Sequence, residues 1–309
     1  MKEQPLPEPD KGYARVKVRA CRICHSDALT KEGAWPGIVY PRCPGHEIAG
    51  IIDALGPATD PWKTGDRVGI GWHGGHCGKC ESCRRGDFIA SAKLQVPGIS
   101  YDGGYSEYVL VPVESLACIP DELGFEEAAP LLCAGVTTFN ALRRSGAQPG
   151  DLVAIQGIGG LGHLGLQFAS KFGFDTVAIG RGEDKRNLAW KLGSRTYPDA
   201  RSPDIAKELA AMGGARVILA TAPDGKAMEA GRGPRREWQI GYRGHQLRAI
   251  RHDIIAIAPG AQVGHGLAGR NVDRFRGRLE VRGSKWGTTD DRNLSAGAGR
   301  RCLRAHDIR

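Results

Sequence analysis

The sequence lacks any apolar run long enough to cross a membrane. Its apolar stretches fall well short of the roughly 18 residues that a spanning helix needs, so we expect no membrane partner. The first residues, MKEQPLPEPDKG, contain no apolar segment typical of a secretory signal, which predicts a cytoplasmic chain. Nine cysteines, an odd number, are then expected to be thiols or metal ligands before disulfide partners.

Lysine is nearly missing from the end of the chain. Residues 231–309 contain 1 Lys and 16 Arg against 7 acidic residues, a net charge of +10. Residues 1–230 contain 26 basic and 27 acidic residues, a net charge of −1. An overall charge of +9 would suggest that the chain binds nucleic acid, but this positive charge comes from residues 231–309 alone. Because the segment has neither a recognisable nucleic-acid fold nor a basic helix, we expect no nucleic-acid partner.

The length of 309 residues suggests about two domains, and the hydrophobic pattern changes between them. Short alternating segments separated by glycine and proline predict an irregular all-β domain up to about residue 120. Strands and helices then alternate, which predicts a parallel, doubly wound α/β sheet. The expected strands of this second part are 152–156, 176–179 and 216–220, and the expected helices include 126–145, 164–172 and 185–192.

A glycine pattern follows the first of these parallel strands. Gly157, Gly159 and Gly162 form G-x-G-x-x-G between a predicted strand and a predicted helix, the context that a dinucleotide site requires. The alternative is an ordinary glycine-rich turn. The next strand ends at Gly180-Arg181 without an acid for a ribose hydroxyl, which favours NADP over NAD unless Arg181 is only a solvated side chain. The expected cofactor-binding residues are Gly157, Gly159, Gly160, Leu161, Gly162, Arg181 and Lys185.

Two groups of residues have the chemistry of metal ligands. Cys24, His46 and Cys133 would give Zn²⁺ two thiolates and one nitrogen with a fourth position open, as in a catalytic site, and Glu47 would be an exchangeable ligand or a neighbour. Spacing alone does not join Cys133 to the others, and buried structural thiols are the alternative. The second group, Cys77, Cys80 and Cys83, suggests a structural zinc lobe that lacks a fourth ligand.

Taken together, these strings resemble the zinc-dependent alcohol dehydrogenases of the medium-chain dehydrogenase/reductase superfamily. The resemblance covers about residues 5–230. The matching strings are ACRICHSD (20–27), PGHEIAG (44–50), GDRVGIGW (65–72), CGKCESC (77–83), DGGYSEY (102–108), LLCAGVTTFNAL (131–142) and QGIGGLGHLG (156–165).

The resemblance implies an architecture and a chemistry. It implies a GroES-like β domain over 1–125, without the family's N-terminal hairpin, and an incomplete Rossmann domain over 126–230. It implies Cys24, His46, Glu47 and Cys133 around a catalytic zinc, Ser26 as the proton relay and His25 near the cofactor pyrophosphate. The expected reaction is reversible oxidation of a primary alcohol to an aldehyde with NAD or NADP. The family also suggests a homo-oligomer. A zinc-free reductase of the same superfamily is the closest rival, against which the full ligand set argues.

Two departures from the family pattern lie beside these sites. The family's fourth structural cysteine should be residue 91, and this chain has Ser91, so we expect a weak or empty lobe and about one zinc per chain. Arg22 stands where the family usually has glycine, next to the catalytic ligands.

The segment 231–309 does not continue the family pattern and predicts a poorly ordered, frameshifted tail. When back-translated codons for 265–282 and 285–301 are moved by one base, they can encode strings that resemble the missing family segments, in the correct order. We place this shift near residues 228–234. For the chain as its sequence stands, the shift predicts little dehydrogenase activity. The alternative is that the chain is a catalytically dead remnant that still binds zinc or cofactor.

Overall fold

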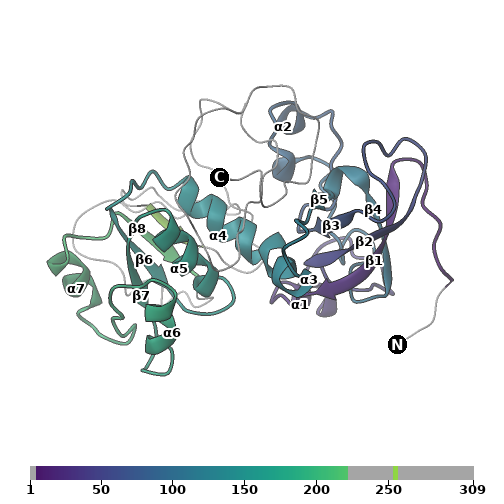
Figure 1. The fold of residues 1–309 in the computed structure, drawn as a ribbon. Coiled ribbons are helices and arrows are strands. Elements are labelled where there is room, and N and C mark those ends of the chain that lie inside the picture. The colour runs from purple at the N-terminus through teal and green to yellow at the C-terminus, as the bar shows by residue number, and fades with distance from the viewer. Residues whose placement is uncertain (1–4, 222–252, 257–309) are drawn as a thin grey trace. The chain divides into compact units, whose positions relative to one another are not determined.

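The computed structural model describes residues 5–221 and 253–256, which form two compact units (Figure 1). The first unit ends at Cys133 and the second begins at Ala134. Within these described residues, no helix combines the length and apolar character needed to cross a membrane.

The first unit is built on an antiparallel five-stranded sheet in the order β4-β1-β2-β3-β5. Its strands are β1 (Tyr13–Cys21), β2 (Ile48–Leu55), β3 (Arg67–Ile70), β4 (Tyr108–Pro112) and β5 (Ala117–Cys118). Val16 pairs with Ile52 across β1 and β2, and both side chains are buried in one core cluster. The pairing continues to Cys21 and Ile48, so the segments that leave these two strand ends stay side by side.

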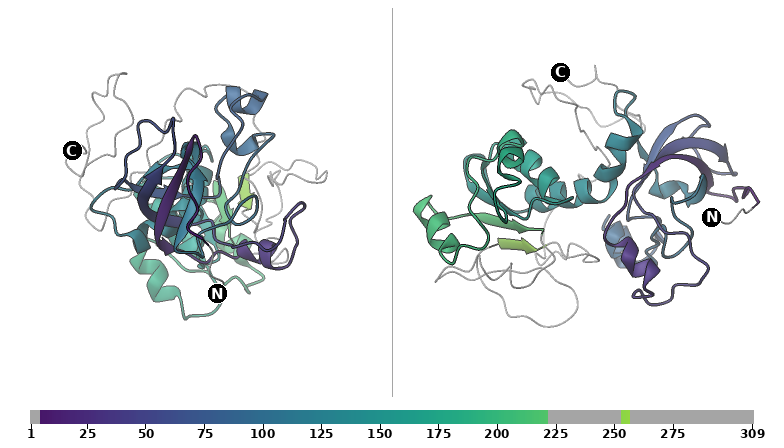
Figure 2. Two further views of the ribbon diagram at one scale, coloured as in Figure 1. Left: turned by 90° about the vertical axis from the view of Figure 1, so that its right-hand side faces the viewer. Right: turned by 90° about the horizontal axis from the view of Figure 1, so that it is seen from below.

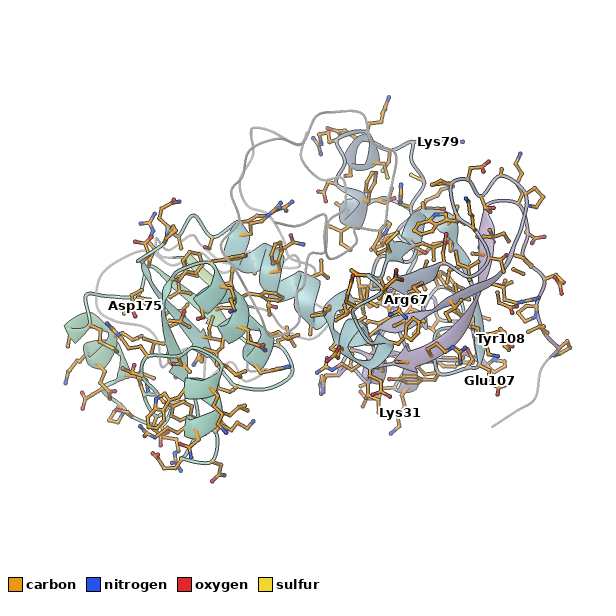
Figure 3. All side chains as sticks on the ribbon, viewed as in Figure 1. Lys31, Arg67, Lys79, Glu107, Tyr108 and Asp175 are labelled. Carbon is orange, nitrogen blue, oxygen red and sulfur yellow. The ribbon has the colours of Figure 1, made fainter. Side chains whose placement is uncertain are left out.

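Short helices complete the first unit. They are α1 (Asp27–Lys31), α2 (Glu81–Arg84), η1 (Phe88–Ala90), η2 (Val113–Ser115), α3 (Phe125–Ala128) and η3 (Ala129–Leu132). The guanidinium of Arg67 (Figure 3) lies 4.1 Å from the centre of the Phe125 ring, which ties β3 to α3. A Cβ atom on Gly71 would lie 2.1 Å from the carbonyl oxygen of Leu132, so glycine is needed for this close approach. These contacts keep α3 and η3 with the sheet, and the unit extends past the boundary at residue 125 that the sequence suggested.

The second unit contains a parallel four-stranded sheet in the order β7-β6-β8-β9. Its elements are α4 (Ala134–Arg143), β6 (Leu152–Gln156), α5 (Gly162–Lys171), β7 (Asp175–Ile179), α6 (Arg186–Lys191), α7 (Ile205–Ala211), β8 (Val217–Ala220) and β9 (Asp253–Ala256). The three strands expected from apolar runs are all present. Together the two units agree with the predicted architecture, a β unit followed by a parallel, doubly wound sheet.

Alternate residues of the central strand β6 belong to two different cores. Val153 and Ile155 pack with Leu166 of α5, whereas Leu152 and Ala154 pack in the cluster that contains Leu209 of α7. Because helices cover both faces, every residue of β6 is buried, which explains its continuous apolar sequence.

Strand β9 corrects one expectation. The sequence predicted a poorly ordered segment over 231–309, but Asp253–Ala256 pairs in parallel with Val217–Ala220 (light-green arrow in Figure 2). The sequence there, Asp-Ile-Ile-Ala, contains a β-branched pair that suits a strand. The other expectations for 231–309, including the frameshift, lie outside the described residues.

Candidate functional site

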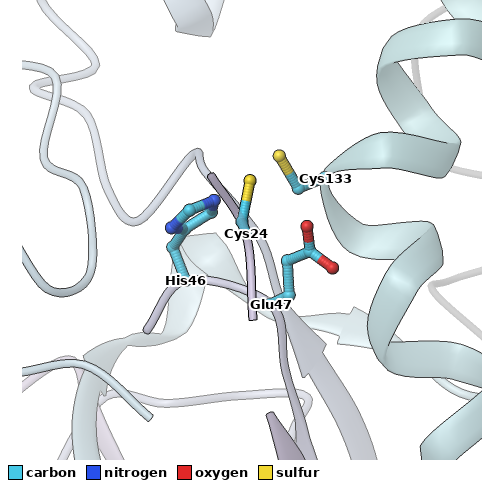
Figure 4. Close-up of side chains that lie close together, drawn as sticks. All are labelled: Cys24, His46, Glu47 and Cys133. Atoms are coloured by element: carbon cyan, nitrogen blue, oxygen red, sulfur yellow. The ribbon is translucent and has the colours of Figure 1, made fainter. Parts of the chain in front are cut away.

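Four potential metal ligands converge in the first unit (Figure 4). Cys24 follows β1, His46 and Glu47 precede β2, and Cys133 follows η3. One donor atom from each lies within 4.8 Å of the others. The Arg22 amide donates to the carbonyl of Glu47 at 3.1 Å, extending the β1–β2 pairing up to the cluster. The fold therefore brings together the first predicted ligand group, including Cys133, which is 109 residues from Cys24 in the chain.

His46 is oriented from one side and has an unpaired nitrogen on the other. Its Nδ1 lies 3.0 Å from Oδ1 of Asp27, while Nε2 is buried and has no hydrogen-bond partner among the described residues. Asp27 is itself held by the amide of Cys24 at 2.8 Å and by the Tyr105 hydroxyl at 2.5 Å. A carboxylate on one imidazole nitrogen is the usual support for a histidine that binds metal through the other.

The thiols and the imidazole form a strongly coupled group. The hydrogen bond with Cys133 lowers the pKa of Cys24 to about 3, and His46 adds to this effect. The same bond, with burial, raises the pKa of Cys133. Burial lowers the pKa of His46, but the hydrogen bond to Asp27 and the negative charge of Cys24 outweigh it and raise the pKa to about 9.

Glu47 is a fully buried carboxylate, and Arg22 forms an ion pair with it. Arg22 Nη1 lies 3.4 Å from Oε1 and 3.3 Å from Oε2 of Glu47. Burial raises the pKa of Glu47 to about 7, while the charge of Arg22 lowers it. Arg22 therefore fits beside the ligand group as a partner for Glu47, and the guanidinium offsets part of the cost of burying that carboxylate.

The residues present fit a zinc ion. Two sulfurs, one imidazole nitrogen and one carboxylate are the donor types that zinc prefers, and His46 Nε2 is a buried polar atom that lacks a partner in the described structure. A bound ion would supply that partner. Trp72 packs edge-on against the His46 ring, with 4.9 Å between centroids, and Trp35 packs on Trp72 at 5.8 Å.

Ser26 and His25 lie beside this ligand group in the chain. Ser26 is buried and is the N-cap residue of α1, yet its hydroxyl makes no capping hydrogen bond. His25 is exposed.

The second predicted ligand group also comes together. The sulfur atoms of Cys77, Cys80 and Cys83 lie within 4.8 Å of one another around α2. Ser91 follows η1 and is buried next to them.

The glycine pattern of the second unit forms the turn from β6 to α5. Gly157 has φ +89°, which favours glycine, and α5 begins at Gly162. A Cβ atom on Gly162 would lie 1.7 Å from the carbonyl oxygen of Gly157. Gly159 is exposed, and a Cβ atom there would meet no heavy atom of the described residues within 4 Å. The turn therefore packs tightly against the helix start and leaves its outer backbone open, which is the shape that a pyrophosphate site needs.

Side chains from two other segments hold this turn. Lys185 Nζ donates to the carbonyl of Ile158 at 2.9 Å. The Thr221 hydroxyl, after β8, lies 2.8 Å from the carbonyl oxygen of Gly157 and 3.0 Å from that of Gln156. Gly160 and Leu161 complete the turn, and Arg181 is exposed after β7.

Sequence reasoning missed three of these supporting residues. Asp27 lies in the same CHSD string as Cys24, so its position three residues after a ligand was a usable signal. Tyr105 contacts Asp27, which lies 78 positions earlier in the chain. Thr221 contacts Gln156 and Gly157, which lie 65 and 64 positions earlier. The sequence offers no local pattern for contacts over such separations.

Comparison with known proteins relates the first unit to one family. Residues 10–121 match the family model described as the alcohol dehydrogenase GroES-like domain. The chain is 47% identical over 223 residues to an alcohol dehydrogenase, patD, of Aspergillus clavatus; this match spans 72% of this chain and 57% of that protein.

Two further matches extend over both units. An alcohol dehydrogenase of Geobacillus stearothermophilus is 41% identical over 232 residues, which is 74% of this chain and 69% of the relative. A crystal structure titled as an NAD-dependent alcohol dehydrogenase superposes with a TM-score of 0.69 at 30% identity, covering 74% of this chain and 68% of that one.

Proposed function

The chain belongs to the alcohol dehydrogenases of the medium-chain dehydrogenase/reductase superfamily, and from this premise we propose that it is a zinc-dependent enzyme that oxidises a primary alcohol to an aldehyde with NADP or NAD. The observation that carries the proposal is the convergence of Cys24, His46, Glu47 and Cys133, with Nε2 of His46 buried and unpaired in the described structure.

Each residue around the ligand group has its own role in the proposed reaction. Cys24, His46 and Cys133 would hold the zinc, and Asp27 would keep the His46 ring turned towards it. Bound zinc supplies a Lewis acid that lowers the pKa of the alcohol, and the nicotinamide accepts the hydride. Ser26 Oγ would accept the alcohol proton, because this buried hydroxyl is not used to cap α1. Exposed His25 would lie near the cofactor pyrophosphate. Arg22 would hold Glu47 beside the ligands, so that a ligand position stays open for the alcohol.

The test is turnover with a matched metal analysis. We expect the purified chain to reduce NADP or NAD with a series of primary alcohols, and chelation of zinc to remove this activity reversibly. Turnover that is unaffected by complete zinc removal would contradict the proposal in favour of a zinc-free reductase.

A catalytically dead remnant is the second candidate, and the composition change near residue 230 favours it. The matched regions span 57% and 69% of the two curated relatives, so full activity depends on what residues 222–309 contribute. Zinc and cofactor binding without turnover would assign this second function. Sequencing the encoding DNA across codons 220–240 tests the proposed frameshift directly.

Cofactor choice gives a separate prediction. We expect Arg181→Gln to lower kcat/KM with NADP by about 10- to 100-fold while leaving kcat/KM with NAD nearly unchanged, because a charge-assisted hydrogen bond to a 2′-phosphate contributes about 1.5–3 kcal/mol. Steady-state kinetics with both cofactors measures this. Arg195→Gln is the matched control, since Arg195 is also an exposed arginine and pairs with Asp175 at the start of β7, whereas Arg181 follows its end. Equal losses with both cofactors would contradict a 2′-phosphate contact.

A further inference from the structure

The lobe around α2 gathers three thiols without a fourth cysteine. Cys80 Sγ lies 3.4 Å from Cys83 Sγ, and Cys77 Sγ lies 3.9 Å from Cys83 Sγ. Backbone N–H groups point at these sulfurs: those of Lys79 and Cys80 towards Cys77, those of Ala92 and Cys83 towards Cys80, and that of Gly78 towards Cys83. Such an array of donors stabilises negative charge on closely spaced thiolates.

Ser91 occupies the fourth side of this cluster. Its Oγ lies 3.6 Å from Cys77 Sγ and 4.0 Å from Cys80 Sγ. The same oxygen accepts hydrogen bonds from the amides of Lys93 at 3.2 Å and Cys77 at 3.4 Å. A hydroxyl has two lone pairs and one proton. The Ser91 oxygen thus accepts from two amides and also faces the Cys80 thiol as a donor, while its own proton is directed at Cys77 Sγ.

This arrangement does not fit a closed zinc site. Structural zinc is held by four ligands in a tetrahedron. The neutral Ser91 hydroxyl is a poor fourth ligand, because its oxygen already accepts from two amides and its proton is directed at Cys77 Sγ. The lobe therefore offers three soft sulfur donors and a hydroxyl that stabilises their charge. Among metal ions that favour thiolates, Cu(I) combines softness with a low demand for ligands, and three sulfurs complete its coordination.

We propose that Cys77, Cys80 and Cys83 form a three-thiolate site for a soft monovalent ion of the Cu(I) class, which the lobe takes in preference to zinc. Binding replaces the thiol protons with the ion and changes no oxidation state. Lys79 (Figure 3) and Arg84 are exposed on the same lobe and add positive charge near the anionic complex. The site is independent of the proposed dehydrogenase function, because it shares no residue with the cluster around His46.

The test is anaerobic titration of the zinc-loaded full chain with Cu(I) carried by a chromogenic chelator. We expect the wild-type chain to take one more equivalent of Cu(I) than Cys80→Ser, without losing zinc from the cluster around His46. Cys43→Ser is the matched control, since Cys43 is a free cysteine outside both groups, and it should titrate like the wild type.

Ser91→Cys keeps the test decisive if Cys80→Ser fails to fold. The added thiol supplies a fourth ligand, so we expect the zinc content to rise from about one to about two per chain and the preference of the lobe for Cu(I) over zinc to fall at least tenfold. A wild-type lobe that keeps its own zinc against Cu(I), or equal Cu(I) uptake by the wild type and Cys80→Ser, would overturn the proposal. Both results are read from metal content and are therefore separate from any failure of turnover.

Discussion

Replacement of Cys24 by serine should strip the zinc from the cluster around His46 and lower kcat/KM by about 10³-fold or more. The Cys24 thiolate is one of the two proposed sulfur ligands, and the serine hydroxyl that replaces it is a poor zinc ligand. Lewis-acid stabilisation of the reacting oxygen contributes several kcal/mol, and each ~1.4 kcal/mol corresponds to a factor of ten in rate. Zinc analysis and steady-state kinetics on the same preparation measure both effects.

Cys43→Ser supplies the control for this experiment. Cys43 is a half-buried free cysteine outside both ligand groups, and its sulfur lies 3.7 Å from the carbonyl oxygen of Pro44. The zinc content and kcat/KM of this variant should match those of the wild type. If Cys24→Ser retained its zinc, the assignment of Cys24 as a ligand would be wrong, whatever the turnover of the chain.

Alanine at Gly162 should both destabilise the second unit and abolish cofactor binding. The added Cβ would lie 1.7 Å from the carbonyl oxygen of Gly157 and 3.0 Å from Oγ1 of Thr221, so the turn must move. Overpacking of this kind costs about 1–3 kcal/mol, and a contact with backbone places this site at the upper end. For a chain of this size we expect the midpoint of thermal unfolding to fall by about 2–4 °C per kcal/mol. Thermal melts and a cofactor-binding titration measure the two effects.

Gly159→Ala separates the two effects of the glycine pattern. In the part of the chain that the structure describes, no heavy atom lies within 4 Å of a Cβ built on Gly159. The fold should therefore tolerate alanine there, with a change in unfolding free energy below about 0.5 kcal/mol. The methyl group would, however, stand where the backbone is proposed to approach the pyrophosphate, and affinity for NADP should fall. Unchanged affinity in Gly159→Ala would count against a pyrophosphate at this turn.

The architecture could be predicted from the sequence because its signals are local. The continuous apolar run of β6 and the glycines after it indicated a buried parallel strand followed by a helix, and the two cores around Val153 and Leu152 explain that run. Strand β9 was missed because a four-residue strand in an arginine-rich segment gives too little periodicity to recognise.

The convergence of Cys24, His46, Glu47 and Cys133 was predicted in a different way. Spacing could not connect Cys133 to Cys24, and only the resemblance to a family joined them; the path of η3 along β3, where Gly71 meets Leu132, is the physical link. The contacts of Asp27 with His46 and of Arg22 with Glu47 depend on side-chain geometry at paired strand ends. The CHSD string marks Asp27 as a neighbour of a candidate ligand, but no sequence pattern specified that it contacts His46 or that Arg22 contacts Glu47.

All four donors around His46 belong to the unit that ends at Cys133. On a ribosome, the last of them is therefore made before any strand of the parallel sheet. Metal capture can begin while the cofactor-binding half is still being synthesised, and a nascent chain that stops soon after this cysteine already carries the complete ligand set. For the proposed function, the chain order therefore allows zinc to be acquired before the dinucleotide.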